Sequence, residues 1–355
     1  MITLVKCRIL DKAWKERQSN EITLDLAKAR RLQSKGLVEI LDKEKEKDCA
    51  QKIALSKDDQ LKVILPGDQN YLNKVKFTNK KKIKIAWVQD YSKPNGGAEL
   101  SNKHIVNIGE TLGFDIVGVI PNKVNKIILN SADLIIINNF FEFPINQFND
   151  IIFSIYENKI PYIKYDHDCR EMKRCHFSRQ LFTLSKLNIF LSPKHLEESV
   201  NIYGEQIRNH SLCLPVSIDV DTYKKRDDIT RLQNSVIVPC YRKCKSTVDA
   251  YINENKHKHF FVIGDIKPND NIEILRKCEP EEMPTLFSRY SEMLHLPKNL
   301  WAGERIYFEA LLCGCIPIVN SNVGHSSWNF GNDFKYELKR APFKFWNSIE
   351  RCLNG

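Results

Sequence analysis

Short apolar runs alternate with amphipathic stretches from residue 83 onward, and this alternation restricts the fold more than any other feature of the sequence. A strand that is apolar along its whole length is covered on both faces, and an amphipathic stretch between two such strands supplies a covering helix. The pattern therefore predicts an α/β fold with parallel sheets. The expected strands of the first set are IKIAWV (83–88), DIVGVI (115–120), DLIIIN (133–138), YIKY (162–165), NIFLS (188–192) and SLCLPV (211–216).

A second set of apolar runs follows the polar stretch at 223–234. Because a chain of 355 residues exceeds the size at which one hydrophobic core stops growing, the two sets predict two doubly wound domains. We place these domains at 83–225 and 233–340. An amphipathic stretch at 342–353 predicts a helix in the remaining segment, 341–355, with its aromatic side chains in the core. The expected strands of the second set are SVIVPC (235–240), HFFVIG (259–264), EMLHLP (292–297) and CIPIV (315–319).

The first 45 residues differ from the rest and predict a small α+β module. ITLVKCRIL alternates as a strand does, EITL and LVEIL predict two more strands, and DLAKARRLQSKG predicts a helix that ends at Gly36. The module resembles short N-terminal modules of bacteriophage proteins. Residues 46–82 are polar and rich in lysine, and we interpret them as a basic linker.

The formal net charge of +10 comes almost entirely from the N-terminal part of the chain. Residues 1–84 contain 21 Lys and Arg against 12 Asp and Glu, whereas residues 85–355 contain 33 against 32. A basic region of this kind attracts nucleic acid, anionic glycans or a membrane surface. The alternative is a solvated lysine-rich surface, which the alternating charges of KEKEK at 43–47 favour.

The cysteine pattern and the N-terminus bear on the compartment. Eleven cysteines are scattered without a Cys-x-x-Cys pair or a Cys/His spacing of the zinc type, which argues against a disulfide framework and a structural metal. The first ten residues alternate in polarity, unlike a signal peptide, and no apolar run approaches 18 residues. We therefore expect a cytoplasmic protein without a membrane span.

Function is expected where the strands end, because free backbone N–H groups at the following helix N-termini favour phosphate there. Gly96 and Gly97 follow the strand at 83–88 and open a helix over 98–113, so the backbone can approach a ligand closely. The strand at 162–165 is followed by Asp166-His167-Asp168. A histidine at such a place is either a ligand contact or a buried structural group.

Two further junctions belong to the second domain. Arg242 and Lys245 stand at the start of the helix expected in CYRKCKSTVDAY (240–251), where the helix dipole disfavours cations unless an anion binds. Near the end of the domain, WAGERIYFEALLCG (301–314) is followed by CIPIV. Arg305 stands four residues before Glu309, so the two side chains share one helix face and are spaced for an ion pair.

These junctions resemble, in the same order, those of the GT-B superfamily of glycosyltransferases, in particular its retaining, nucleotide-sugar-dependent members. The family pattern is Glu, seven residues, then Glu-Ala-x-x-x-Gly-x-Pro, and Glu309 to Pro317 match its second half residue by residue. FLSPKHLEESVNIYG (190–204) and LPVSIDVDTY (214–223) are similar to the segments that lead from the first domain to the second. The resemblance covers roughly residues 83–320 and implies two facing Rossmann-like domains, with the acceptor on the first and the donor on the second.

The resemblance also implies a role for each junction. The donor would be a nucleotide sugar, with UDP or GDP as the nucleotide, and basic side chains would neutralise its diphosphate in place of a metal ion or another cofactor. The helix at 341–355 would cross back onto the first domain. The implied positions are Gly96 and Gly97 at the diphosphate or the acceptor, His167 at the donor sugar, Arg242 and Lys245 at the diphosphate, Glu309 at the ribose hydroxyls, and Arg305 at a phosphate.

The first half of the family pattern is not matched. Trp301 stands eight residues before Glu309, where the family has a glutamate near the donor sugar. An indole cannot accept hydrogen bonds from a sugar as a carboxylate does, although it can stack on a sugar or a base. Glu304 is the nearest carboxylate, and because it lies five residues from Glu309 it faces another side of a helix. We assign Glu304 a catalytic place at the start of that helix, facing the cleft.

Several alternatives remain open. In the other major glycosyltransferase fold, a D-x-D pattern such as Asp166–Asp168 holds Mn²⁺ or Mg²⁺. A catalytically degenerate GT-B domain that only binds a sugar nucleotide or a glycan is favoured by Trp301, and a sugar-nucleotide epimerase shares the fold. For the acceptor, DNA carrying hydroxymethylated bases suits the basic N-terminal region and the phage-like module. A surface polysaccharide and a virion protein are the other candidates.

Overall fold

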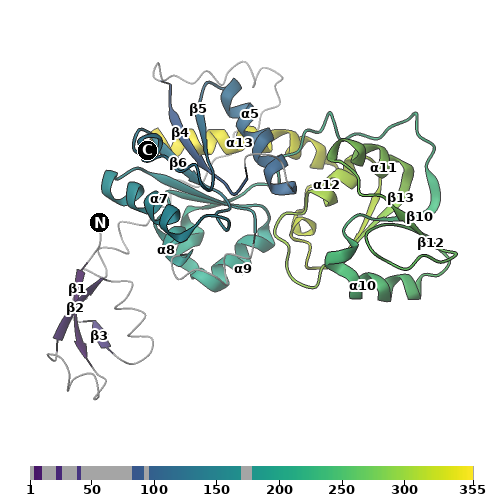
Figure 1. The fold of residues 1–355 in the computed structure, drawn as a ribbon, viewed down its shortest axis with the longest axis horizontal. Helices are drawn as coiled ribbons and strands as arrows, with labels where there is room; N and C mark the ends of the chain where they lie inside the picture. Colours follow the sequence, from purple (N-terminus) through teal and green to yellow (C-terminus); the bar gives the residue numbers. More distant parts are fainter. Residues whose placement is uncertain are drawn as a thin grey trace. The chain divides into compact units, whose positions relative to one another are not determined.

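The computed structural model describes residues 4–9, 21–25, 38–40, 82–91, 96–168 and 178–354. The chain divides into two compact units, with the division after Val75 (Figure 1). In the first unit, strands β1 (Leu4–Ile9), β2 (Glu21–Asp25) and β3 (Val38–Ile40) form an antiparallel sheet in the order β2-β1-β3. These are the three strands expected there. The expected helix that ends at Gly36 and nearly all of the linker at 46–82 lie outside the described residues.

The second unit contains two parallel sheets. The first sheet has the order β5-β4-β6-β7-β8-β9, and every neighbouring pair is parallel. Its strands are β4 (Lys84–Val88), β5 (Asp115–Val119), β6 (Leu134–Ile137), β7 (Tyr162–Asp166), β8 (Leu187–Phe190) and β9 (Ser211–Cys213). Its helices are α5 (Gly97–Thr111), α6 (Lys126–Asn130), α7 (Ile145–Asn158), α8 (Ser178–Leu184), α9 (Pro193–Tyr203) and the 3₁₀ helix η2 (Glu205–His210).

Alternate side chains of these strands pack into two layers, as the period of two in a strand requires. In β4, Ile85 and Trp87 face the layer that contains α5, whereas Ala86 and Val88 face the layer that contains α7. All four residues of β6 are buried. Helices therefore cover both faces of the sheet, which is why its strands are continuous apolar runs in the sequence.

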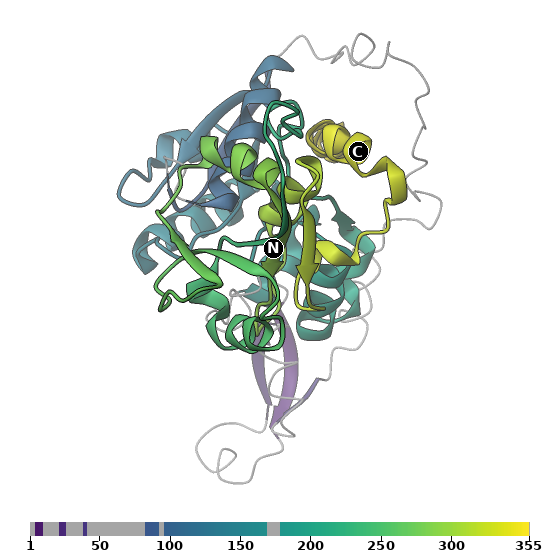
Figure 2. The same cartoon turned by 90° about the vertical axis from the view of Figure 1, so that its right-hand side faces the viewer.

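The second sheet has the order β12-β11-β10-β13-β14 and is also parallel throughout. Figure 2 turns this part of the unit toward the viewer. The strands are β10 (Leu232–Val238), β11 (His259–Ile263), β12 (Ile272–Leu275), β13 (Tyr290–His295) and β14 (Ile316–Val319). The helices are α10 (Tyr241–Glu254), α11 (Met283–Arg289), α12 (Arg305–Leu312) and the 3₁₀ helices η3 (Pro280–Glu282), η4 (Gly324–Ser327) and η5 (Gly331–Asp333).

One strand of the second sheet was not expected from the sequence. β12 pairs only with β11 and forms the edge of the sheet. Its central residues, Glu273 and Ile274, are exposed, so the strand lacks the continuous apolar run that marks the buried strands. Edge strands of this kind escape a search for buried strands because only part of their surface is covered.

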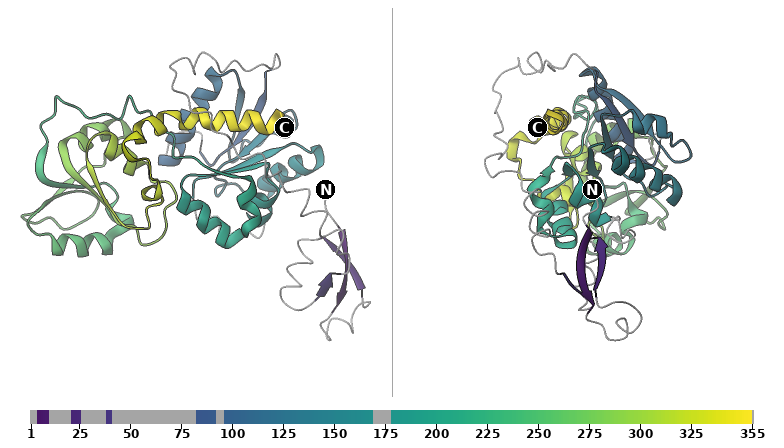
Figure 3. Two further views of the ribbon diagram at one scale, coloured as in Figure 1. Left: turned by 180° about the vertical axis from the view of Figure 1, so that it is seen from behind. Right: turned by 90° about the vertical axis from the view of Figure 1, so that its left-hand side faces the viewer.

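The last helix, α13 (Phe334–Asn354), is longer than the helix expected at 342–353 and contains Pro342 in its interior. The helix begins eight residues earlier than expected, at Phe334. α13 packs against α5 of the first domain (Figure 3). Phe345 and Trp346 are buried in the core, as expected for its aromatic residues. None of the helices among the described residues has the length and apolar character needed to cross a membrane.

Candidate functional site

Each sheet has one strand at which the chain stops adding strands on one side and begins to add them on the other. In the first sheet, β4 lies between β5 and β6, and in the second sheet β10 lies between β11 and β13. At such a point the two following helices leave on opposite faces and open a crevice outside the carboxyl ends of the strands.

His167 directly follows β7 and is 8% exposed. Its ring lies edge-on to Tyr165, with 4.3 Å between the ring centroids, and no hydrogen-bond partner meets its Nε2 atom among the described residues. Burial lowers the pKa of His167 to about 3, since the charged imidazolium would lose its hydration. His167 is therefore a neutral imidazole at neutral pH, with an unused ring nitrogen.

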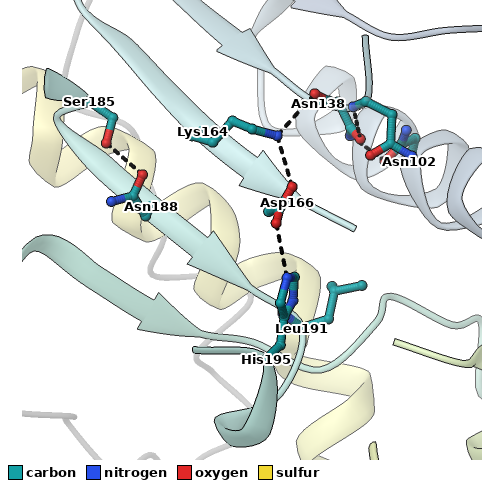
Figure 4. Close-up of polar contacts among 9 residues, drawn as sticks. Asn102, Asn138, Lys164, Asp166, Ser185, Asn188, Leu191 and His195 are labelled. Atoms are coloured by element: carbon teal, nitrogen blue, oxygen red, sulfur yellow. Dashed lines mark hydrogen bonds and ion pairs between the residues drawn. The ribbon is translucent and has the colours of Figure 1, made fainter. Parts of the chain in front are cut away.

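Asp166, the last residue of β7, is held by two buried side chains (Figure 4). Its Oδ1 lies 3.0 Å from Nζ of Lys164, and its Oδ2 lies 2.9 Å from Nε2 of His195. Burial raises the pKa of Asp166, but the Lys164 ammonium and the hydrogen bond from His195 outweigh it and hold that pKa below its usual value. Both oxygens of Asp166 are thus engaged inside the protein. This arrangement disfavours the D-x-D alternative, in which Asp166 and Asp168 would share a cation.

Arg305 and Glu309 form a buried ion pair at the start of α12. Nε of Arg305 lies 2.7 Å from Oε1 of Glu309, and the residues are 7% and 4% exposed. Nη1 of Arg305 donates to the Ser217 carbonyl at 2.8 Å and to Oγ of Ser101 at 3.2 Å, and both of these acceptors follow strands of the first sheet. Its guanidinium also lies over the ring of Tyr223, 5.6 Å from the centroid. The pair expected from the i, i+4 spacing is present, and Arg305 also ties α12 to α5.

The two glycines stand at the start of α5. Gly96 is its N-cap residue and Gly97 its first residue. A Cβ atom on Gly97 would lie 3.3 Å from Cδ of Arg305, which is closer than almost all real contacts of this kind. The absence of a side chain at Gly97 therefore lets Arg305 pass beside the helix. Gly97 and Arg305, singled out separately in the sequence, are neighbours in space.

Glu304 precedes α12 and is the N-cap residue of that helix. Its side chain is 20% exposed, and Oε2 lies 3.8 Å from Nε2 of His295, the last residue of β13. Its carbonyl accepts a hydrogen bond from Nδ1 of His325 at 3.0 Å. Burial lowers the pKa of His325 to about 3, so this ring is neutral and carries its proton on Nδ1. Trp301 forms a bridge with Val323 and meets the ring of His295 edge-on, with centroids 5.2 Å apart.

Arg242 and Lys245 lie in the first turns of α10, after β10, and both side chains are exposed. Cys244 lies between them in the sequence and turns inward, with Sγ 3.6 Å from Nδ1 of His295. The start of α10 is therefore linked through His295 to Glu304. Basic side chains at a helix N-terminus are unfavourable for the helix dipole unless an anion offsets them.

The structure brings the expected residues together in two groups. Gly97, Arg305 and Glu309 make direct contacts, and Glu304 is linked to the start of α10 through His295. His167 belongs to the first sheet, and no hydrogen bond joins it to either group among the described residues. Sequence reasoning missed the buried residues that surround these positions. They are Lys164, His195, His295 and His325, of which Lys164 and His295 carried a signal, as polar residues inside expected apolar strands.

Within residues 82–91, 96–168 and 178–354 and the three N-terminal strands, no group of three or more His, Cys, Asp or Glu side chains could hold a metal ion. In the described part of the chain after residue 81, the seven cysteines are free thiols.

Neither a protein-family model nor a curated protein sequence matches the chain. Among solved structures, sucrose-phosphate synthase from Thermosynechococcus elongatus is 10% identical and has a TM-score of 0.53, with 77% of this chain and 94% of that chain covered. An α-glucosyltransferase in complex with UDP-glucose and DNA containing an abasic site is 13% identical, with a TM-score of 0.50 and coverages of 77% and 94%. HepE from Anabaena, in complex with UDP and glucose, is 13% identical, with a TM-score of 0.49 and coverages of 76% and 92%.

The likeness to the synthase and the α-glucosyltransferase, together with the two parallel sheets, confirms the expected fold. The second unit of this chain has the GT-B architecture of two Rossmann-like domains. The domain limits at 225, 233 and 340 stay predictions.

Proposed function

We propose that the chain is a glycosyltransferase that moves a sugar from a nucleotide-sugar donor to a hydroxyl group of an acceptor. The observation that carries the proposal is the gathering of the sequence-predicted residues at the carboxyl ends of two parallel sheets with the GT-B architecture. The fold is shared with sucrose-phosphate synthase and with an α-glucosyltransferase crystallised with UDP-glucose, which supports a sugar-nucleotide donor.

Each residue has a role that follows from its chemistry. Arg242 and Lys245 at the start of α10 would neutralise the diphosphate as the glycosidic bond breaks, with the helix dipole in support and no metal ion required. His167, neutral and with Nε2 unused, would bond a hydroxyl of the donor sugar. Glu304 is partly exposed and would face the same sugar.

Nucleotide binding by Glu309 requires a rearrangement in this proposal. The carboxylate of Glu309 is buried and paired with Arg305, so it would bind ribose hydroxyls only after the pair opens or shifts. Arg305 would then be released toward a phosphate. A donor that binds in this way weakens the Arg305 contacts with Ser101 and Ser217.

The decisive experiment is a donor panel. The full chain is incubated with UDP-, GDP-, ADP- and CMP-sugars, and free nucleotide is measured over time. We expect turnover of a UDP- or GDP-sugar, turnover that persists in excess EDTA, and a weaker nucleotide affinity in Glu309→Ala. The enzyme proposal fails if no donor is consumed and Glu309→Ala leaves nucleotide affinity unchanged. Loss of activity in EDTA would favour a bound metal, and a donor returned with an inverted sugar centre would favour an epimerase.

For the acceptor we propose DNA, because the N-terminal region is basic and the α-glucosyltransferase with this fold is found on DNA. Basic segments bind DNA through release of counterions, so the logarithm of the binding constant falls steeply with the logarithm of the salt concentration. Titration of the full chain with duplex DNA at several salt concentrations tests this. Binding that ignores salt would remove DNA and leave a glycan or a protein hydroxyl as acceptor.

A second candidate function is a module that binds a sugar nucleotide or a glycan without turnover. Trp301 favours it, because the family's glutamate is replaced by a tryptophan whose backbone bridges to Val323 and whose indole packs edge-on against His295. Nucleotide binding without consumption of any donor in the panel, abolished by Glu309→Ala, would establish this second function in place of the first.

A further inference from the structure

Lys164, Asp166 and His195 form a fully buried group beneath the strand ends of the first sheet (Figure 4). Lys164 and His195 are 0% exposed and Asp166 is 1% exposed. Burial of an ion pair removes the hydration of both charges, and apolar residues of similar volume commonly give equal or greater stability. The donor-side and acceptor-side roles proposed above do not use this group, so its presence calls for another role.

The hydrogen bonds fix the protonation of His195. The backbone N–H of Leu191 points to Nδ1 of His195 at 3.4 Å, so Nδ1 must be an acceptor. Nε2, 2.9 Å from Asp166, must then carry the proton and donate it to the carboxylate. A neutral His195 satisfies both contacts, while the Lys164 ammonium balances the Asp166 carboxylate. The group is thus electrically neutral, and each of its three side chains is hydrogen-bonded.

The group connects three strand ends. Nζ of Lys164 also donates to the carbonyl of Asn138 at 3.2 Å, directly after β6. Nδ2 of Asn138 donates to Oδ1 of Asn102 at 2.7 Å, in α5 after β4. Figure 4 shows these contacts as one continuous path from α5 to α9. Nδ2 of Asn102 in turn donates to Oε1 of Gln89, directly after β4, at 3.4 Å, so hydrogen bonds link the ends of β4, β6 and β7 to the start of α9.

The path continues into the second domain. The backbone N–H of His195 is 3.1 Å from Oγ of Ser192, the N-cap residue of α9. The same Oγ donates to the Ala302 carbonyl at 2.9 Å, two residues before Glu304. His167 adjoins Asp166 in the middle of this path, and Glu304 lies two residues beyond Ala302, where the path ends.

We propose that Lys164, Asp166 and His195 are positioning residues that hold His167 and the Ala302–Glu304 segment at a fixed separation across the candidate site. The inference rests on the proposed glycosyl transfer for its effect on rate. Both oxygens of Asp166 are engaged, so the group acts through His167 rather than on the donor. Misplacement of reacting groups by about 1 Å can lower a rate about a hundredfold. Accurate positioning of His167 can therefore explain why the protein keeps a buried ion pair that is costly to desolvate.

The test compares three variants of the full chain. His195→Phe removes the hydrogen bond to Asp166 but leaves the ion pair with Lys164, whereas His195→Gln keeps a donor near the place of Nε2. Ser185→Ala is the matched control, because Oγ of Ser185 donates to Asn188 in another buried polar pair of the same domain, which has no hydrogen bond to Asp166 or His195 (Figure 4). Each variant is measured for the nitrogen resonances of the His167 ring in ¹⁵N-histidine-labelled protein, for kcat and for donor KM.

For His195→Phe we expect the His167 resonances to move or broaden, kcat to fall about 10- to 100-fold and donor KM to stay within about twofold, as for other supporting residues. His195→Gln should recover most of the loss, and Ser185→Ala should change neither the resonances nor kcat. An unmoved His167 resonance in His195→Phe, or an equal fall of kcat in Ser185→Ala, overturns the proposal.

Two further points keep the test decisive. If His195→Phe does not fold, Lys164→Met/Asp166→Asn removes both charges together and is measured in the same way, with the same expected and contrary results. If the native protein consumes no donor, the proposed transferase function fails, and the His167 resonances still decide whether the three residues position that ring.

Discussion

Nε of Arg305 lies 2.7 Å from Oε1 of Glu309, and this pair is buried at the point where α12 meets the first domain. Nη1 of the same arginine is bonded to Ser101 and to the carbonyl of Ser217. On an exposed helix, an ion pair between residues four apart is a weak contact. Here the pair is buried and lies at the centre of the contact between the two domains. Removal of this ion pair should therefore lower the free energy of unfolding of the whole unit.

We predict that Glu309→Ala lowers the free energy of unfolding by about 3–5 kcal/mol, because Arg305 is left as an uncompensated buried charge. Arg305→Met/Glu309→Leu removes both charges and should lie closer to the native protein than either single variant. Urea unfolding of the native protein, Arg305→Met, Glu309→Leu and the double variant measures the coupling between the two side chains. Lys126→Ala is the control, since its pair with Asp150 at 2.9 Å is exposed and should contribute less than about 1 kcal/mol. Equal losses for Glu309→Ala and Lys126→Ala would contradict the prediction.

The buried rings of His167 and His325 should make the folded protein less stable in acid. Burial lowers the pKa of each ring from 6.5 to about 3 in the folded protein. Below about pH 6.5 the unfolded chain takes up protons that the folded protein does not. The stability that depends on the two neutral rings is therefore fully present above pH 6.5 and is lost as the pH falls toward 3. Each ring contributes a slope of up to about 1.4 kcal/mol per pH unit in that window.

The measurement is urea unfolding at a series of pH values between 3 and 7. His167→Asn should reduce the slope of the free energy of unfolding against pH, whereas the same change at the exposed His257 should leave it nearly unchanged. A slope that is the same in His167→Asn and in the native protein would show that the imidazole titrates normally in the folded state.

Much of the fold was predictable because buried parallel strands carry a plain signal. β6, with four buried apolar residues, has no polar face to confuse it with a surface strand. β12 was missed because Glu273 and Ile274 face solvent at a sheet edge. By contrast, Trp346 in α13 packs against Gly109 in α5, more than 200 residues earlier in the chain. No local sequence pattern encodes such a pairing.

The candidate site was predictable only where its contacts are local. The Arg305–Glu309 pair follows from four-residue spacing, but the partners of Arg305 in the first domain lie 204 and 88 residues away. Asp166 was interpreted as a cation ligand in one alternative, although its oxygens face Lys164 and His195. The signal that was overlooked is Lys164 itself. A lysine inside an apolar strand that helices cover on both faces needs a buried partner.

Replacement of Gly109 in α5 by alanine should change the free energy of unfolding in the direction opposite to the one that helix propensity predicts. Alanine is favoured over glycine in a helix by about 1 kcal/mol. A Cβ atom at this position, however, would lie 2.5 Å from Cε2 of Trp346, whose indole nitrogen donates to the Ile105 carbonyl at 2.8 Å. We expect Gly109→Ala to lower the free energy of unfolding by about 1–3 kcal/mol, as overpacking of a core does. Gly118→Ala in β5, where a Cβ atom meets nothing within 4 Å, should be neutral or stabilising. Stabilisation by both changes would show that α13 does not pack here.

Arg231 lies outside the candidate site and contacts the carboxyl ends of two helices. Its guanidinium donates to carbonyls at the carboxyl ends of two helices, to Ser288 in α11 at 3.1 Å and to Cys313 after α12 at 2.7 Å, and it also reaches the Gly314 carbonyl. The last carbonyls of a helix have no partner within the helix, and a cation beside them is favoured by the helix dipole.

Arg231→Ala should therefore lower the free energy of unfolding by about 2–3 kcal/mol, since several charge-assisted hydrogen bonds are lost together. Arg231→Lys should recover only part of this, because an ammonium is one compact donor and cannot serve two helix ends as the planar guanidinium does. Thermal and urea unfolding of both variants check the order. Arg276→Ala is the control, as its pair with Glu282 is exposed and should contribute little. Full recovery by Arg231→Lys would mean that charge alone matters at this position, and that the shared capping of α11 and α12 does not hold the second domain together.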